Sequence, residues 1–215
     1  MSLPLIHTPK KRWQPLWVER PGLIIPGRPR DPVPRSLQMF PVGAFGGFQT
    51  LATTPDTNNS VGWAGYCLRT VIPASTYLFL PSGTLTLRPW RKAATAGNNT
   101  TITAIYIGHP ATAPDFDGGQ KLTTSAGLAS YTIISSGSDV PLDDVTDFAF
   151  DPTKNLMFSI GFATTPASDV RRRGTTGYTS HFKAAAAAEV ADTTVSGYST
   201  EADNQYLVSK VEVFV

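Results

Sequence analysis

Apolar and polar side chains alternate along short stretches in the second half of the chain. In residues 156–162 (LMFSIGF) a large apolar side chain occupies every second position. A period of two is typical of a β-strand with one buried face. Residues 100–107 are almost wholly β-branched or aromatic, and residues 131–134 repeat that composition over a shorter length, as strands commonly do. Together these three stretches predict half of an antiparallel β-sandwich.

Further strand signals lie on both sides of these stretches. Short apolar runs are separated by Pro73 and by the Pro-Ser-Gly turn at 81–83, and such punctuation is typical of strand ends. The candidate strands are residues 65–72, 77–80 and 84–87. Residues 206–215 alternate again and predict a closing strand. We interpret the three arginines at 171–173 as a solvated loop, and the alanine-rich residues 183–192 predict a short surface helix.

The first 41 residues differ in composition from the rest of the chain. They contain nine of the eighteen prolines, and this density excludes a helix or a central strand, because each ring removes an amide donor and restricts the preceding residue. We therefore expect an extended arm. Its large apolar side chains would be wasted in water, so we interpret it as a segment that becomes ordered along another protein's surface. The alternative is that the arm wraps its own sandwich.

The arm and the sandwich form the two predicted parts of the chain. The residues expected to dock the arm are Trp13, Trp17, Leu23, Ile24, Ile25, Arg28 and Arg30. Residues 42–47 (VGAFGG) mark the hinge where the arm ends. We therefore divide the chain into a Pro-rich docking arm at 1–45 and a β-sandwich domain at 46–215. A length of 215 residues suits one all-β domain with an appendage.

Charge is low in total and uneven along the chain. Charged residues make up 16% of the sequence, below the usual value of about 25%. Residues 1–45 carry seven Lys and Arg against Glu19 and Asp31, a net charge of +5, which leaves −3 for the remainder of a chain with net charge +2. Basic residues beside Trp13 and Trp17 could suggest nucleic acid. Because prolines dilute them and no binding motif accompanies them, we do not expect nucleic-acid binding.

Cysteine usage and apolar runs restrict the environment of the protein. Cys67 is the single cysteine, so no intramolecular disulfide forms, and we expect a small buried hydrophobe. No apolar run approaches the roughly 20 residues of a membrane helix, and we expect no membrane partner. Pro4, Pro9 and the basic residues 10–12 occupy the place of a signal peptide's apolar segment. We therefore expect synthesis in a cytoplasm.

Motifs of common enzymes and cofactor sites are missing from the sequence. No two of the three histidines are at ligand spacing, and we find no nucleophile elbow, P-loop or dinucleotide fingerprint. We therefore expect no enzyme, no cofactor and no metal. Asp115 and Asp117 before two glycines resemble a fragment of a calcium loop, and residues 143–147 form a second acidic cluster. Asx turns explain both clusters equally well.

Aromatic residues outside the strand cores are candidates for sugar stacking, because an aromatic ring offers a flat apolar face to a pyranose. The candidates are Trp63, Trp90, Tyr106, Tyr178 and Tyr198. Trp90, between Pro89 and Arg91 past a predicted strand end, is the strongest of them. Trp90 and Tyr178 are the predicted glycan-binding positions. Carboxylates suited to a glycosidase could not be paired from the sequence alone.

Three short sequence motifs resemble those of a known class of protein module. They are YIGH at 106–109, the Ser-Asp pair at 138–139, and FxFDxxxxLxxSIxF at 148–162. Over residues 65–215 this pattern resembles the carbohydrate-binding-like β-sandwich modules of phage virion proteins, and is similar to the jelly-roll domain that accompanies some GDSL-type esterases. The resemblance implies an all-β fold, an antiparallel jelly-roll-like β-sandwich preceded by the Pro-rich extended arm. It carries over no catalytic residue.

The resemblance also implies a place on a virus particle, in the tail, baseplate, neck or head decoration. We therefore expect a non-enzymatic bacteriophage structural protein, located in the virion and docked through residues 1–41. Its expected partners are other virion proteins and copies of itself in a cyclic homo-oligomer. One alternative is a glycan-binding module for adsorption to the host surface. Another is an accessory domain of a hydrolase.

Overall fold

The structure is a computed structural model that describes residues 48–53, 58–60, 62–77, 80–92, 97–135, 139–165 and 168–214. The chain divides into two units, Met1–Val42 and Gly43–Val215, and all described residues belong to the second. The predicted docking arm therefore lies outside the described residues. The same holds for its predicted contact residues, Trp13, Trp17, Leu23, Ile24, Ile25, Arg28 and Arg30.

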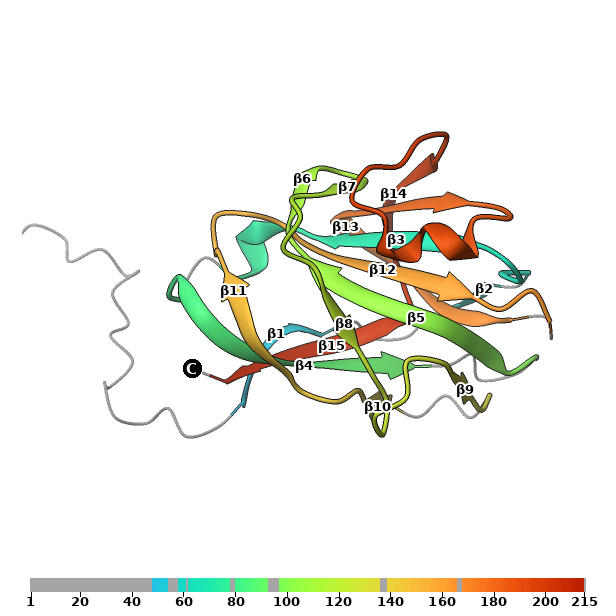
Figure 1. Ribbon diagram of the computed structural model, residues 1–215, viewed down its shortest axis with the longest axis horizontal. Coiled ribbons are helices and arrows are strands. Elements are labelled where there is room, and N and C mark those ends of the chain that lie inside the picture. The colour runs from blue at the N-terminus through green and yellow to red at the C-terminus, as the bar shows by residue number, and fades with distance from the viewer. Residues whose placement is uncertain are drawn as a thin grey trace, which may run out of the picture. The chain divides into compact units, whose positions relative to one another are not determined.

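One antiparallel sheet has five strands in the order β1–β15–β4–β10, with β11 also paired to β4 (Figure 1). The strands are β1 (Phe48–Thr53), β4 (Gly83–Lys92), β10 (Asp139–Pro141), β11 (Val145–Phe150) and β15 (Val208–Phe214). β15 is the predicted closing strand, and it lies between β1 and β4. The first described strand is therefore held in the sheet by the last one.

The second antiparallel sheet has eight strands, with the order β14–β13–β3–β12–β5–β8. Two short strands pair outside this path, β2 with β13 and β9 with β5. The strands are β2 (Asn58–Ser60), β3 (Cys67–Ile72), β5 (Thr100–Gly108), β8 (Lys121–Thr123), β9 (Tyr131–Ile133), β12 (Leu156–Phe162), β13 (Val170–Lys183) and β14 (Ser199–Tyr206). A separate hairpin joins β6 (Pro110–Thr112) and β7 (Asp115–Phe116).

A single hydrophobic cluster joins the two sheets. It takes Leu85 and Leu87 from β4 and Val211 and Val213 from β15. From the other sheet it takes side chains of β3, β5 and β12, which include Leu68, Ile72, Ile102, Ile105, Ile107, Leu156, Phe158, Ile160 and Phe162. Burial of apolar surface from both layers is what holds two sheets face to face. The all-β, antiparallel sandwich predicted from the sequence is confirmed.

The second face of β12 is buried as well, which the alternation in 156–162 did not predict. All seven residues of β12 are buried. Its smaller side chains lie under a short 3₁₀ helix, η2 (Ala187–Ala191), and Val190 of this helix is buried. A Cβ atom at Gly161 would lie 2.9 Å from the Ala187 carbonyl oxygen. Glycine at this position lets the covering helix approach the sheet closely.

Two sequence predictions of local structure differ from the structure. The strand expected at 77–80 lies partly outside the described residues; before it stands a 3₁₀ turn, η1 (Ala74–Thr76), and Tyr77 is buried in the core with its hydroxyl donating to the Lys154 carbonyl at 2.7 Å. The arginines expected in a loop at 171–173 belong to β13. The helix expected at 183–192 is only η2, because Lys183 still pairs with Cys67 in the sheet.

Helical structure within the described residues consists of these short 3₁₀ segments. None of the described helices has the length and apolar character needed to cross a membrane.

Candidate functional site

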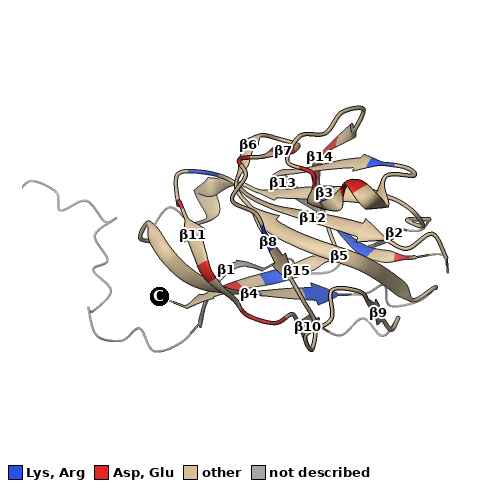
Figure 2. Cartoon of the chain, viewed as in Figure 1, with Lys and Arg blue, Asp and Glu red and all other residues tan. Residues whose placement is uncertain are grey.

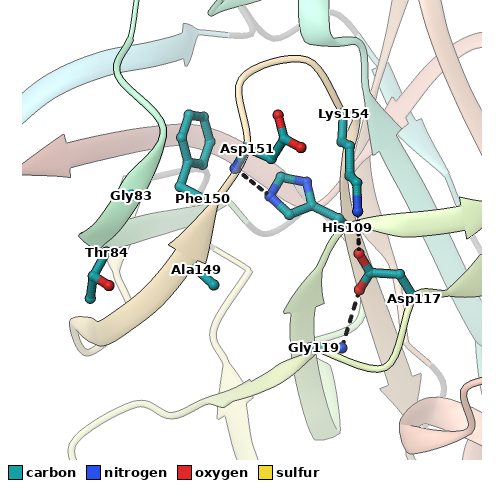
Figure 3. Close-up of a pocket in the computed structure, with 9 residues that line it drawn as sticks. All are labelled: Gly83, Thr84, His109, Asp117, Gly119, Ala149, Phe150, Asp151 and Lys154. Atoms are coloured by element: carbon teal, nitrogen blue, oxygen red, sulfur yellow. Dashed lines mark hydrogen bonds and ion pairs between the residues drawn. The ribbon is translucent and has the colours of Figure 1, made fainter.

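A hollow in the described part of the chain lies between the start of β4, the end of β11 and the β6–β7 hairpin. We call it the His109 pocket, and its volume is about 400 Å³ (Figure 3). It is lined by Gly83, Thr84, His109, Asp117, Gly119, Ala149, Phe150, Asp151 and Lys154. The lining comes from the start of β4, the end of β11, the turn after β11 and the segments around β6 and β7. Residues far apart in the sequence therefore meet here.

His109 is fixed in the wall of this pocket by the backbone of the turn after β11. It is 4% exposed and follows the last residue of β5. Its Nε2 accepts the amide proton of Asp151 at 3.0 Å, and its Nδ1 lies 2.7 Å from the Asn155 carbonyl oxygen. Because a backbone N–H only donates, the ring proton is assigned to Nδ1, which donates to Asn155. Neither nitrogen is left to transfer a proton to a ligand.

Packing on the ring also restrains His109. The imidazole lies 5.5 Å from the Phe148 ring and 5.7 Å from the Phe150 ring, measured between centroids. Figure 3 shows the ring between the Asp151 turn and the Lys154 side chain. We therefore assign His109 a structural role in shaping the pocket.

The charged groups at the mouth of the His109 pocket form a fixed pair. Lys154 Nζ lies 3.0 Å from Asp117 Oδ2, and Asp117 Oδ1 accepts the Gly119 amide at 3.1 Å. Partial burial raises the pKa of Asp117, but the hydrogen bonds from Lys154 and Gly119 outweigh it and hold this pKa below its usual value. The same hydrogen bond raises the pKa of Lys154. Both groups are therefore charged at neutral pH.

Asp151 is the second carboxylate at the mouth of the pocket. Its Oδ1 accepts from both the Thr153 hydroxyl at 2.7 Å and the Thr153 amide at 2.9 Å. These two hydrogen bonds lower the pKa of Asp151. Two carboxylates, one ammonium group and the Thr84 hydroxyl thus border a hollow whose chemistry suits hydrogen bonding to a hydroxyl-rich molecule.

The two acidic clusters of the sequence anchor loops. Asp115 accepts the Val195 amide at 2.9 Å. Asp117 accepts hydrogen bonds from the Gly119 amide and from Lys154. Asp143 accepts the Thr124 hydroxyl at 2.6 Å and the Gly127 amide at 2.8 Å. Within the ranges that the structure describes, no three His, Cys, Asp or Glu side chains are grouped so that they could hold a metal ion.

The two predicted glycan-binding residues are not brought together. Tyr178 is 6% exposed and belongs to the hydrophobic core, so it offers no ring face to a sugar. Trp90 is half-buried on β4 of the other sheet, where its Nε1 donates to Glu212 at 2.9 Å. The Lys210 ammonium lies 3.8 Å from the centroid of the Trp90 ring. This cation–π contact already covers a face of the indole.

A second hollow, the Trp63 pocket, has a volume of about 260 Å³. It is lined by Gly62, Trp63, Tyr66, Arg172, Phe182, Glu201 and Tyr206. The Trp63 ring centroid lies 5.4 Å from that of Tyr66, 5.7 Å from Phe182 and 4.9 Å from Tyr206. The sequence analysis named Trp63 as a stacking candidate but did not predict this pocket, because its aromatic residues come from three separate segments. The nearest signal is the spacing of Trp63 and Tyr66 around Gly65.

A third arrangement that the sequence did not predict surrounds Arg69 on β3. This side chain is 0% exposed. Its guanidinium donates to the carbonyl oxygens of Pro114 at 2.5 Å, Asp192 at 2.6 Å and Glu189 at 3.0 Å. It also lies 5.0 Å from the centroid of the Phe116 ring. Arg69 therefore joins the β6–β7 hairpin and the η2 segment to the sheet.

Charges on the described strands and connections are of mixed sign (Figure 2). The visible Lys and Arg positions are interspersed with Asp and Glu. This pattern differs from the continuous basic stripe that marks many nucleic-acid surfaces.

Comparison with protein-family models finds no match for this chain. Comparison with curated proteins finds none either.

Proposed function

We propose that the chain is a non-enzymatic structural component of a bacteriophage particle, docked through residues 1–41. The tail, baseplate, neck and head decoration are the candidate locations. The resemblance of residues 65–215 to virion sandwich modules suggests the particle. The docking role is supported by the composition of the hydrophobic core between the two sheets.

The described residues of the second unit form an extensive apolar core. The cluster between the sheets runs from Trp63 to Val213, and the outer face of β12 is covered by η2 and by Phe116 of β7. The apolar side chains of the first 41 residues would gain free energy by leaving water, and we propose that they do so on a surface outside this core. An adjacent protein of the particle supplies such a surface.

The test removes the two tryptophans of the arm in the full chain. We expect the Trp13→Ser/Trp17→Ser variant to keep the circular dichroism spectrum and melting temperature of the wild type. Its incorporation into particles, measured by mass spectrometry of virions purified from the encoding phage, should fall by about tenfold or more. Buried tryptophans commonly contribute about 2 kcal/mol or more to an interface, and about 1.4 kcal/mol is tenfold in affinity.

Leu128→Ser is the matched control, since this residue is 60% exposed on the sandwich and its substitution should leave incorporation unchanged. Unfolding of the double tryptophan variant would show that the arm belongs to its own sandwich, and normal incorporation would show that the tryptophans do not dock it.

The His109 pocket favours a second candidate function, the binding of a host-surface glycan. This function is favoured by the charged and hydroxyl groups that border the pocket, among them Lys154 and Asp151. We expect an oligosaccharide array to identify a ligand for the full chain, and Lys154→Ala and Asp151→Ala each to weaken that binding by about tenfold, as the loss of one charged hydrogen bond does. Binding that survives both substitutions, or an array without a ligand, would reject the pocket as a glycan site.

A further inference from the structure

The segment that follows β13 contains η2 and lies against the eight-stranded sheet (Figure 1). We call residues 184–198 the strap. Its buried hydrophobic residues are Ala186 and Val190, so burial of apolar surface contributes little to holding it in place. Ala185 has a φ of 52°, in the left-handed region that alanine rarely adopts. A covering segment with few buried apolar side chains opens locally at a low cost in free energy.

Polar contacts hold the strap against the sheet, and the Arg69 guanidinium makes two of them. It donates to the carbonyl oxygens of Glu189 at 3.0 Å and Asp192 at 2.6 Å. The remaining hydrogen bonds join the strap to Gly65, Asp115, Phe116 and Gln120. A change that moves the guanidinium should therefore loosen the strap.

His181 lies beside Arg69 in the sheet and under the strap. The two residues are cross-strand partners of β13 and β3, and Lys183 and Cys67 form a second pair two positions away on the same face. The Tyr198 ring of the strap has its centroid 5.7 Å from Arg69 Cζ and 5.8 Å from Lys183 Nζ. Because Arg69 and Lys183 are diagonal corners of this group of four, the ring lies across the site where His181 is buried.

The closed strap disfavours the protonated form of His181. The Nδ1 atom lies 3.0 Å from the Thr200 hydroxyl, and Nε2 is buried without a hydrogen-bond partner among the described residues. A protonated imidazole donates from both nitrogens, so Nε2 would become a buried donor without an acceptor. A second positive charge would also lie beside Arg69. Burial, and then the charge of Arg69, lower the pKa of His181 below 6.5.

Other titratable groups lie on the elements packed around His181. They are Lys183 on its own strand, Cys67 on β3, Glu201 on β14, and Glu189, Asp192 and Tyr198 on the strap. Glu189 accepts from Lys183 at 2.6 Å, Glu201 pairs with Arg172, and Asp192 is exposed. Burial raises the pKa of Tyr198, so its hydroxyl stays neutral in acid. The charge that acts on His181 is that of Arg69.

We propose that the strap is an acid-sensitive lid, in which proton uptake by His181 displaces Arg69 from the strap carbonyls and opens residues 184–198 while the sandwich stays folded. This inference does not depend on the proposed function. As the pH falls below 6.5, the open form takes up a proton before the closed form does. The closed form is therefore fully favoured above pH 6.5 and is progressively lost below it.

The experiment uses the full chain, with its single cysteine as the reporter. Cys67 is 0% exposed, so its reaction with dithiodipyridine, which modifies thiols in mildly acidic solution, reports opening of the strap. The rate is divided by that of the urea-unfolded chain at the same pH, which removes the intrinsic pH dependence of the thiol. We expect this ratio to rise by about five- to tenfold between pH 7.5 and 5.5, as uptake of one proton allows.

Native-state hydrogen exchange distinguishes local opening from unfolding in the wild type. The amides of Glu189 and Asp192, which close the turns of η2, should lose protection over the same range of pH. Amides of β4 and β15 in the other sheet should keep theirs. Parallel loss of protection in both sheets would overturn the proposal, because Cys67 would then be reached by global unfolding.

Two variants separate the proton from the hydrogen bond. His181→Asn can keep a hydrogen bond to Thr200 but does not titrate, and it should remove the rise in Cys67 labelling. Thr200→Val loses the same hydrogen bond but keeps the imidazole, and it should retain the rise. An equal rise in the wild type and His181→Asn would overturn the proposal, and so would its loss in both variants.

Discussion

At the scale of single residues, the buried guanidinium of Arg69 holds two covering segments against the eight-stranded sheet. Its three acceptors are the carbonyl oxygens of Pro114, Glu189 and Asp192. A planar fork of donors suits several carbonyl groups at once, which a lysine ammonium does less well. Without the guanidinium, the carbonyl oxygens of Pro114 and Asp192 would lose this donor, and the loss of a buried hydrogen-bond partner costs about 1–3 kcal/mol.

We therefore expect Arg69→Met to lower the free energy of unfolding by about 3 kcal/mol, measured by urea denaturation. Arg69→Lys should recover only part of this loss. Native-state hydrogen exchange should show that the amides of Glu189 and Asp192, which close the turns of η2, lose protection first.

Arg88→Met provides the control, because Arg88 pairs with Asp144 on a partly exposed surface and such pairs are commonly worth about 0–1 kcal/mol. Equal destabilisation by the Arg88 and Arg69 substitutions would show that Arg69 does not hold the covering segments.

At the scale of elements, the sequence predicts a strand best where its pattern is local. Residues 100–107 and 156–162 became β5 and β12 because β-branched and aromatic side chains favour the pleated sheet. The long strand β13 was missed because Gly174 and Gly177 interrupt its pattern, and its register shifts between Gly174 and Thr179. Strand pairing with β3 and β14 overrides this weak local signal.

The covering layer and the pockets are harder to predict for a similar reason. Gly161 gives no sign in the sequence that η2 will approach it, since the contact depends on Ala187, 26 positions later along the chain. The Trp63 pocket likewise gathers Phe182 and Tyr206 from distant strands. The sequence suggested aromatic binding residues, and Tyr178 was one of those predicted. In the structure Tyr178 belongs to the hydrophobic core. Long-range packing decides which aromatic residues remain at a surface.

At the scale of the whole molecule, stability should fall on acidification in two separate ranges of pH. The upper range involves His181, which is 7% exposed and lies with Nδ1 3.0 Å from the Thr200 hydroxyl. Burial, and then the charge of Arg69, lower the pKa of His181 below 6.5. As the pH falls below 6.5, the unfolded chain therefore takes up a proton before the folded chain does, which favours unfolding.

The lower range involves carboxylates, among them Asp143. Hydrogen bonds from the Thr124 hydroxyl and the Gly127 amide lower the pKa of Asp143 below 3.8. Such a group stabilises the fold at pH values above 3.8, and this contribution is lost as the pH falls through the folded-state pKa. In the unfolded chain the pKa of a histidine lies about two units above that of a carboxylate. The two ranges of pH are therefore separate.

His181→Asn tests the upper range, because asparagine can keep a hydrogen bond to Thr200 without titrating. We expect the unfolding free energy of the wild type, measured by urea denaturation from pH 8 to 3, to decline below pH 6.5 with a steeper slope than that of the variant. The difference in slope should reach at most about 1.4 kcal/mol per pH unit, the value for one proton. Below pH 4 the two curves should fall together as the shared carboxylates are protonated. Parallel curves between pH 6.5 and 5 would mean that the buried imidazole accepts its proton as readily in the folded chain as in the unfolded one, which its position next to Arg69 opposes.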